Sequence, residues 1–575
     1  MADVSSGSSS LSQSDSDSDS DFFLGWEDVS SSSSEAESTT DDSDLPLSVV
    51  AQRLRAARAG PAPASARGKR ARPRASVGPA LQWEEQDSSP FRHGFSGRGG
   101  AMDPRLSSSS TCREIFELFV DDELYDLLLT ETNRYARQRP ISQSAHMRAW
   151  TSVTLREMQA FLALSIMTGI VTVPSLHAYW STDPLMRTYL FSSVMPRDRF
   201  LAILQALHFH NNEDMAKDCP DRLFKLRPVI DHLLLKFDTI YTPDRDISVD
   251  DSLFKFYGRL HFKTYNPRKR ARFGIKAYKL CQSTGDAAGY CSKFRIYTGE
   301  DRGPLPASTA IVLDLVSGLQ GKGYNLALDR AFSSPDLFRR LHEAKFNVVG
   351  TVMPCRRDMP KSLRTVRLKA GEVAHRSAAI GQNGSLLALV WKDKKDIRLL
   401  STMHTSEVRP SGKRDRAGND KVKPACVLAY NRLMGGVDRS DQLAANHRSA
   451  RKSIKWYKKL FFYLVDLTLV NCYALSLALG HHGSFLDFRR ELSRELLYDE
   501  PLPQYGPRRQ LPAAPAEQAA PHFPKSLDRT SYGDYRYRHC VHCSAQGRRK
   551  KTHFECDTCR QPLCVDPCFR EYHAP

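Results

Sequence analysis

The order of short apolar segments between residues 246 and 352 constrains the fold of this chain more than any other feature. Short segments rich in β-branched or aromatic residues come first, and turn residues separate them. A helical segment, an apolar strand, a second helical segment and a last strand follow. Short strands followed by a helix, a strand, a helix and a strand describe a mixed α/β sheet, and this order matches the ribonuclease-H-like fold. The segments are 247–249, 259–265, 277–281 and 291–297, then the helix 307–317, the strand 324–328, the helix 335–344 and the strand 347–352.

Helical regions flank this predicted sheet on both sides in the sequence. Apolar residues fall at helical spacing after residue 112, and Thr154 with Glu157 forms a capping-box pattern. A chain of 575 residues is too long for one core, so we expect several units. They are 1–111, disordered, acidic and then basic; 112–245, helical; 246–353, the first part of the α/β core; 354–418, irregular and β-prone; 419–441, the second part of the core; 442–499, helical; 500–535, a linker; and 536–575, a Cys-rich domain.

The charge of the chain is unevenly distributed. Residues 1–50 hold 12 acidic residues and no Lys or Arg. Removing these 12 negative charges from the total of +18 leaves +30 on residues 51–575. A surplus of this size attracts a polyanion, because each neutralised phosphate releases condensed counterions. We therefore expect nucleic acid as the partner, although charge alone is also compatible with a role in solubility.

The N-terminal hundred residues contain short motifs but no apolar pattern for a core. Serines flanked by acids in 14–21 resemble the sites of acid-directed kinases. The basic run 68–74 reads as a nuclear import signal or a DNA-binding arm. With this run we expect a nuclear protein, and the N-terminus shows no secretory signal. We also expect no membrane partner, because polar residues interrupt the most apolar window, 460–479, which suits a buried helix better.

Three aspartates follow the predicted strands or begin a predicted helix. Asp250 closes the first strand, Asp329 closes the strand 324–328, and Asp438 lies at the start of a helix. Ligand sites in open α/β sheets lie beyond the carboxyl ends of the strands. Carboxylates in this arrangement can hold two Mg²⁺ ions for an in-line phosphoryl displacement. Each aspartate alone is equally compatible with an ordinary helix cap or strand end.

The C-terminus carries a Cys/His cluster with the spacing of metal ligands. Two Cys-x2-Cys pairs lie twelve residues apart, and a tight turn lets each pair bind one tetrahedral ion. Seven ligands are too many for one zinc ion and one short of two, so His553 or His542 is a candidate eighth. We expect one or two structural Zn²⁺ ions, and a basic strip at 548–551 that contacts DNA. The predicted ligands are Cys540, Cys543, Cys556, Cys559, Cys564, Cys568, His573 and His553.

Long motifs around these aspartates resemble the core of the piggyBac-family transposases. One such motif is Tyr-Asn-Arg-Leu-Met-Gly-Gly-Val-Asp-Arg-Ser-Asp-Gln at 430–442. The resemblance extends from about residue 112 to the end of the chain. The other motifs that carry it are 221–228, 250–259, 267–276, 329–334, 350–352 and 456–459.

The resemblance implies a function and assigns further residues to it. In that family the three matched aspartates bind the catalytic metals, and the residue matched by Asp441 assists. The family cuts double-stranded DNA at terminal inverted repeats, passes through hairpins and inserts at TTAA. It implies that 354–418 is an insertion domain and that the flanking helices bind DNA and form a homodimer. The expected DNA-binding residues are Arg268, Lys269, Arg270, Arg272, Arg356, Arg451, Lys452, Lys455, Trp456 and Lys459.

Three positions depart from the family pattern. Arg330 stands where family members usually carry Asn, and it places a cation beside the metal site. Asp251 replaces a Glu, and Met353 replaces a basic residue. The three metal-binding aspartates are intact, so the first interpretation is an active cut-and-paste transposase. The alternatives are a domesticated DNA-binding protein without transposition activity, and a nuclear interaction scaffold that recruits partners through its acidic tail.

Overall fold

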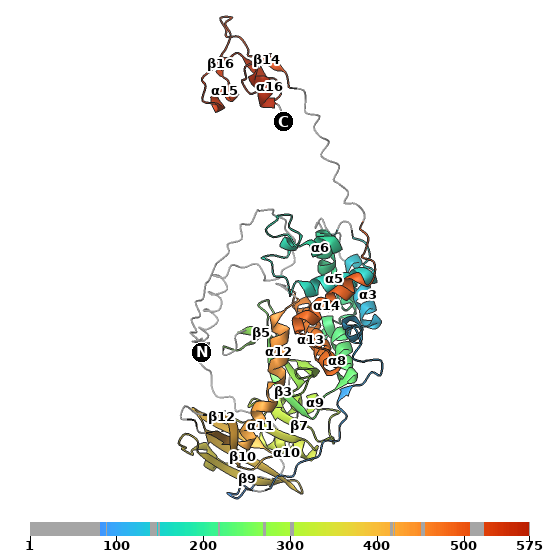
Figure 1. Ribbon diagram of the computed structural model, residues 1–575, viewed down its shortest axis with the longest axis vertical. Helices are drawn as coiled ribbons and strands as arrows, with labels where there is room; N and C mark the ends of the chain where they lie inside the picture. The colour runs from blue at the N-terminus through green and yellow to red at the C-terminus, as the bar shows by residue number, and fades with distance from the viewer. Residues whose placement is uncertain are drawn as a thin grey trace, which may run out of the picture. The chain divides into compact units, whose positions relative to one another are not determined.

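The computed structural model describes residues 81–573 except 88, 139–146, 148–149, 217–218, 268–271, 300–303, 415–417, 419, 450–454 and 506–521 (Figure 1). The acidic and basic segments predicted before residue 81 lie outside the described residues. Five of the predicted DNA-binding residues also lie outside them, namely Arg268, Lys269, Arg270, Arg451 and Lys452.

A nine-stranded mixed sheet forms the centre of the described chain. β3 pairs antiparallel with β5, β5 pairs antiparallel with β6, and β3, β7 and β8 run parallel. The helices α9 and α10 make the two crossovers between parallel strands, so the predicted order of elements is confirmed. The elements are β3 (Asp246–Lys255), β4 (Thr264–Tyr265), β5 (Phe273–Gln282), β6 (Cys291–Ile296), α9 (Ala307–Leu315), β7 (Asn325–Leu328), α10 (Pro335–Glu343) and β8 (Asn347–Thr351).

The β-prone span 354–418 does not form a sheet of its own. Its strands β9 (Val373–Ile380), β10 (Gly384–Lys392) and β11 (Asp396–Ser401) continue the central sheet beyond β8. After them, β12 (Val408–Arg414) and β13 (Asp420–Pro424) pair as a hairpin, although the charged, Gly-containing stretch 410–423 has the composition of a loop. Exposed charged side chains dominate both strands, so no alternation of apolar residues indicated them.

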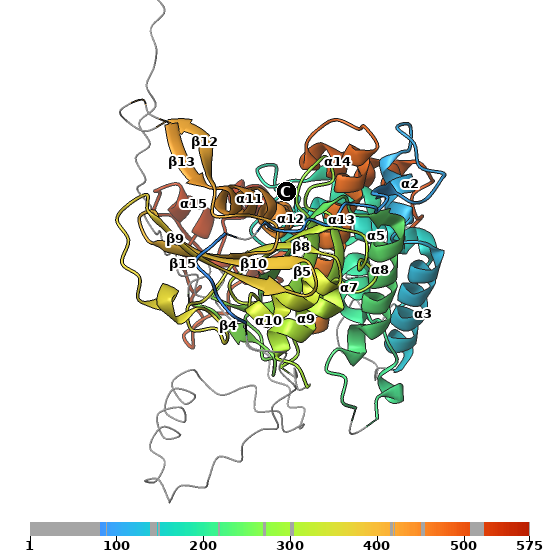
Figure 2. The ribbon, with the colours of Figure 1, turned by 90° about the horizontal axis from the view of Figure 1, so that it is seen from below.

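The sheet is covered on both faces, as the period-2 alternation of its strands requires. Leu326 and Leu328 pack with α9 and α10, whereas Ala327 packs with α11 (Ala425–Leu433) on the opposite face. Along β10, Ala388 belongs to the first of these cores and Leu389 to the second. Figure 2 shows α9 and α10 on one side of the sheet and α11 on the other.

A helical layer packs beside β5 and β6 in one continuous apolar core. The helix α13 lies at its centre and contacts α2, α8, α12 and α14. Among the described helices, α13 is the one long and apolar enough to cross a membrane, but 83% of its most apolar window is buried inside the fold. The predicted buried helix at 460–479 is thus confirmed. The layer comprises α2 (Cys112–Glu117), α3 (Asp122–Gln138), α5 (Leu155–Met167), α7 (Arg197–Ala206), α8 (Arg227–Ile240), α12 (Gly435–Asn446), α13 (Trp456–Ala478) and α14 (Phe485–Tyr498).

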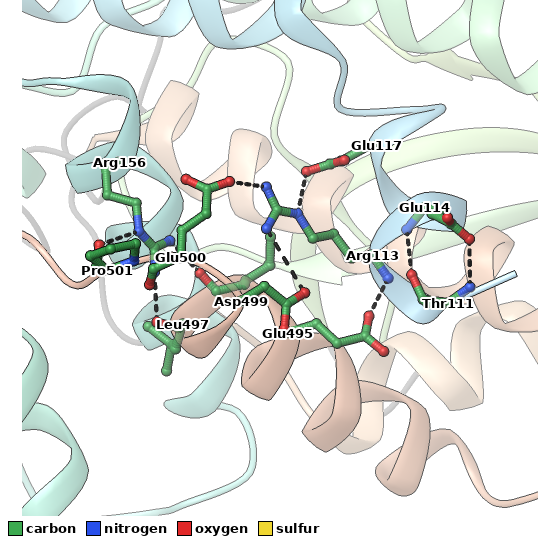
Figure 3. A network of polar contacts seen from close by, with 11 residues as sticks. Thr111, Arg113, Glu114, Glu117, Arg156, Glu495, Leu497, Asp499, Glu500 and Pro501 are labelled. Atoms are coloured by element: carbon green, nitrogen blue, oxygen red, sulfur yellow. Dashed lines mark hydrogen bonds and ion pairs between the residues drawn. The ribbon is translucent and has the colours of Figure 1, made fainter.

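Two arginines join the helices before the sheet to those after it (Figure 3). Arg113 pairs with Glu117 on its own helix and with Glu500 just beyond α14, each at 2.7 Å. The guanidinium of Arg156 donates to four backbone carbonyls, at 2.5 to 3.0 Å, around the end of α14. These bonds satisfy acceptors that a helix C-terminus leaves without partners. The two helical regions therefore form a single layer.

Residues 81–87 and 89–106, called here the N-terminal strap, lie along the sheet. Trp83 Nε1 donates to the Asp358 carbonyl at 2.9 Å, and Arg92 Nε donates to the Met403 carbonyl at 2.7 Å. The strand β1 (Gly100–Ala101) pairs with β2 (Tyr241–Thr242). The prediction of disorder up to residue 111 is therefore wrong for 81–111. The strap docks largely through hydrogen bonds to backbone groups, which composition does not reveal.

The C-terminal module begins earlier than predicted. The strand β14 (Pro524–Ser526) pairs with β17 (Phe554–Cys556), so the second part of the predicted linker 500–535 belongs to this module. The short strands β15 (Arg538–His539) and β16 (Lys551–Thr552) pair with each other, and the helices α15 (Val541–Ala545) and α16 (Cys568–His573) complete the module.

Candidate active site and metal clusters

Asp250 and Asp329 lie at the carboxyl ends of neighbouring parallel segments. The parallel pairing of β3 with β7 ends at Val249 and Leu328, and each aspartate is the next residue of its chain segment. The prediction that Asp250 closes its strand is wrong, because β3 continues to Lys255 and pairs there with β5 alone. The end of the parallel pairing nevertheless puts both carboxylates at one edge of the sheet.

Asp438 reaches the same place from the first turn of α12. The helix approaches β3 very closely at Gly436, where an added Cβ would lie 2.6 Å from the Gln282 carbonyl oxygen and 2.8 Å from the Ser248 hydroxyl. Only glycine permits this contact, because any side chain would push the helix away from the strand. The Gly-Gly motif therefore sets how near Asp438 comes to the sheet.

The hydroxyl of Tyr430, on α11, lies within electrostatic reach of all three aspartates. Burial, followed by the negative charges of Asp329, Asp250 and Asp438, raises the pKa of Tyr430 to about 12. The Thr351 hydroxyl lies 3.3 Å from that of Tyr430 and donates to Asp329 Oδ1 at 3.5 Å. All three predicted carboxylates thus act on one hydroxyl. Tyr430 and Thr351 were in the recognised motifs, but nothing in the sequence indicated their contact.

The three carboxylates offer the hard oxygen ligands that Mg²⁺ prefers. They are not among the groups of three in the described residues whose ligand atoms lie within 4.8 Å of one another. A two-metal site places its ions about 3.5–4 Å apart and spreads its ligands over both. The arrangement is therefore compatible with ligands divided between two ions, rather than with one compact cage.

Asp441 is held away from this group by a buried cation. Its Oδ1 accepts from Lys279 Nζ and from Ser252 Oγ, each at 2.7 Å. The Lys279 side chain is 0% exposed. Burial alone would lower the pKa of Lys279, but the charge of Asp441 and, after it, of Tyr463 raises it well above its usual value. This ion pair joins α12 to β5, so it positions Asp438, which lies one turn before Asp441.

Lys279 was missed in the sequence. The signal that could have found it is a lysine within the apolar strand 277–281, because a buried lysine needs a partner.

The predicted DNA-binding residues that are described lie in different surroundings. Arg272 is exposed beside the β4–β5 hairpin, and Lys455 is exposed before α13. Arg356 donates to the carbonyl oxygens of Arg330 and Ala331, so it holds the loop after Asp329. Arg330 itself is exposed beside that aspartate, and Met353 is exposed as well.

Trp456 and Lys459 line two separate hollows. Trp456 packs edge-on against Phe262, with ring centroids 5.8 Å apart. These two rings line an open hollow of about 590 Å³ together with Arg222, Arg259 and His261. Lys459 lines a smaller cavity next to Asp441. Basic and aromatic side chains therefore line both hollows around the start of α13.

The cysteines and histidines of the C-terminal module form two clusters of four. Within each, all ligand atoms lie within 4.8 Å of one another, and the two sets alternate along the chain, which is a cross-braced arrangement. Thiolate and imidazole groups in sets of four suit tetrahedral Zn²⁺. One cluster is Cys540, Cys543, Cys564 and Cys568, and the other is His522, Cys556, Cys559 and His573.

The predicted eighth ligand is corrected by this geometry. His553 packs on Phe554 with ring centroids 4.2 Å apart and lies in neither cluster. His542 pairs with Glu571 at 2.9 Å. His522 takes the place instead, with Nδ1 3.1 Å from Cys556 Sγ. It was missed because it follows a Pro/Ala-rich stretch, far in sequence from the Cys pairs.

Comparisons with known proteins show which family this chain resembles. The family model described as Transposase IS4 matches residues 111–473. Human PiggyBac transposable element-derived protein 2 is 26% identical over 423 residues, which cover 71% of this chain and 68% of that protein. Human PiggyBac transposable element-derived protein 3 is 26% identical over 477 residues, which cover 80% of this chain and 76% of that protein.

A solved structure adds evidence on the fold. The cryo-EM structure of a piggyBac transposase synaptic complex with hairpin DNA matches with a TM-score of 0.62 and 23% identity, and covers 83% of this chain and 98% of that chain. At this identity the likeness concerns the fold alone. Taken with the family match over more than half of the residues, these findings show that the chain belongs to the piggyBac family of transposases.

Proposed function

We propose that this protein is a DNA transposase of the piggyBac type with a ribonuclease-H-like catalytic core. It cleaves double-stranded DNA at terminal inverted repeats and joins the ends to TTAA targets. The observation that carries the proposal is the placement of three carboxylates: Asp250 and Asp329 directly follow the paired parallel segments, Asp438 lies in the first turn of α12, and the charges of all three reach the Tyr430 hydroxyl. Three carboxylates at such an edge are the equipment for metal-assisted phosphoryl transfer.

Each residue of the site has a defined task in this reaction. Asp250, Asp329 and Asp438 hold two Mg²⁺ ions, which supply charge for activating the attacking hydroxyl and stabilising the leaving oxygen. Thr351 orients the carboxylate of Asp329 by its hydrogen bond. Lys279, through Asp441, holds α12 and therefore Asp438 in place. The basic surface of residues 51–575 binds the DNA backbone.

The remaining parts of the chain support the same activity. Two Zn²⁺ ions in the C-terminal clusters order the module, so that the strip Arg548 to Lys551 contacts the inverted repeat. The protein acts as a homodimer through its helical layer and enters the nucleus by means of the basic run 68–74. The acidic tail is a substrate of acid-directed kinases.

A second candidate is a domesticated nuclear DNA-binding protein that does not transpose. Two observations favour it. Arg330 places an exposed cation directly after Asp329, where it competes with Mg²⁺ for the carboxylate. The similar human proteins are also named as transposable element-derived. A cation at this position is equally suited to contact a phosphate, so the measurement below decides between the two.

The test is cleavage of duplex DNA that carries the repeats flanking the coding region in its genome. Asp250→Asn, Asp329→Asn and Asp438→Asn should each abolish Mg²⁺-dependent cleavage and leave binding intact. Asp251→Asn is the matched control, because this neighbour pairs with Lys276 at 2.6 Å instead. Cleavage that survives in any of the three variants would refute the assigned ligands. Binding without cleavage in the wild-type chain would favour the domesticated alternative.

A further inference from the structure

A small cavity of about 110 Å³ lies next to the active site between β3, α12 and α13. A water molecule takes about 30 Å³ in the liquid, so the cavity holds a group of a few heavy atoms and no base pair. β3 connects it to the catalytic edge, because this strand runs from Asp250 at that edge to Lys255 in the cavity wall. The five residue steps from Asp250 to Lys255 span about 16 Å, which is a distance of a few nucleotides.

Three cations line this cavity from three separate elements. Lys255 comes from β3, Arg448 from the segment just after α12, and Lys459 from the first turn of α13. Burial, and after it the positive charges of Arg448 and Lys255, lower the pKa of Lys459, whereas Asp466 opposes this effect. Lys459 therefore lies close enough to Arg448 and to Lys255 for their charges to destabilise its own, which costs energy in the absence of an anion.

The two carboxylates in the wall do not cancel this positive charge, because each has a cation of its own. Asp441 is bound by the buried Lys279 at 2.7 Å. Asp466 pairs with Arg489, whose side chain is 0% exposed, at 3.4 Å. Asp466 also accepts from the backbone N–H of Ser449 at 3.0 Å. Five cations in and behind the wall thus stand against two carboxylates, and the net charge of these groups is positive.

We propose that this cavity, which we call the anion pocket, binds one phosphate group of a DNA strand a few nucleotides from the scissile bond. A phosphate fits because a planar guanidinium and two ammonium groups match its tetrahedral oxygens. The inference rests on the proposed function, and it adds a contact that fixes the path of the strand from the catalytic edge along β3. Arg448 and Lys459 are positioning residues in this reaction.

The first test measures how salt weakens binding of the full chain to a mixed-sequence DNA duplex. Each phosphate contact contributes about 0.9 to the slope of log K against log salt. Arg448→Gln/Lys459→Gln should lower that slope by about 0.9, whereas Arg490→Gln on the exposed side of α14 should lower it less. The double variant should remain folded, and its thermal unfolding curve checks this. An unchanged slope in the double variant would overturn the proposal.

The second test uses inorganic phosphate and measures the Tm of the same chains. Phosphate should raise the Tm of the wild type and of Arg490→Gln, because an anion that binds the folded state stabilises it. The Tm of the double variant should not change, because its pocket no longer binds the anion. An equal rise in all chains would overturn the proposal. A rise confined to the intact pocket, without any change in DNA binding, would identify a site for free anions and overturn its assignment to DNA. A wild-type chain that binds phosphate but no duplex would refute the proposed function separately.

Discussion

In the α/β core, a nine-stranded sheet and the helix α12 bring three aspartates from distant parts of the sequence close enough for their charges to act on one tyrosine hydroxyl. In the C-terminal module, eight cysteine and histidine ligands come together within residues 522–573, supported by strands of two or three residues. The core buries large apolar clusters on both faces of its sheet. The module has only a small core, and most of that core is cysteine.

In the core the fold determines the site, whereas in the module the metal site determines the fold. The folded sheet prepares the aspartates, so their site should exist before any metal binds. The module cannot bury enough apolar surface to fold alone, so its metals should create the fold that holds them.

Removal of metal should unfold the module and spare the core. A fragment of residues 521–575 should bind two Zn²⁺ ions and lose all ordered structure on addition of a strong chelator, because ligand binding supplies its folding free energy. Circular dichroism and zinc release measure both changes. In the full chain the same chelator should leave the main thermal transition in place. A fragment that stays folded without metal would end the contrast.

Breaking the buried ion pair should destabilise the core without any metal. Lys279→Met leaves Asp441 without its cation, and we expect a loss of about 3 kcal/mol in the free energy of unfolding. This is the lower end of the usual range because 32% of the Asp441 side chain is exposed. Urea titration followed by tryptophan fluorescence measures the loss. Lys279→Met/Asp441→Leu should recover most of it, and a stable single variant would contradict the role of the pair.

The two module histidines should separate cleanly. His522→Ala should remove one ligand of the second cluster and lower the zinc content of the module from two ions towards one. His553→Ala should keep both ions, because this ring only packs against Phe554. A chromophoric zinc indicator counts the ions in each variant. Equal zinc content in the two variants would refute His522 as the eighth ligand.

Arg330→Asn should have the smallest effect, a several-fold change in excision of a reporter element. If the cation beside Asp329 hinders Mg²⁺, excision should rise in the variant and the Mg²⁺ concentration needed for half-maximal rate should fall. If it contacts phosphate, excision should fall and binding of DNA should weaken. An unchanged rate in an active protein would show that the position is neutral.

Much of the core could be predicted because its strands are apolar and its helices periodic. The three aspartates were found because they follow such strands or begin a helix. Their meeting at Tyr430 and the docking of Lys279 on Asp441 were not, since both depend on which side chains of separate elements face each other.

The failures have physical causes of their own. The continuation of the sheet by β9 to β11 was missed because local sequence does not specify a partner strand. The N-terminal strap was missed because it binds largely through backbone hydrogen bonds. The hairpin of β12 and β13 lacks an apolar face, and His522 lies apart from the Cys pairs that define the module.

The burial of α13 also bears on how the chain is synthesised. A helix this long and apolar is a risk while it emerges from the ribosome, because membranes and other nascent chains bind such segments. Two helices that contact it, α2 and α8, precede it in the sequence, and α14 follows after a short turn. Most of its covering surface therefore exists before translation reaches it. The order of the elements along the chain shortens the time for which this helix remains exposed.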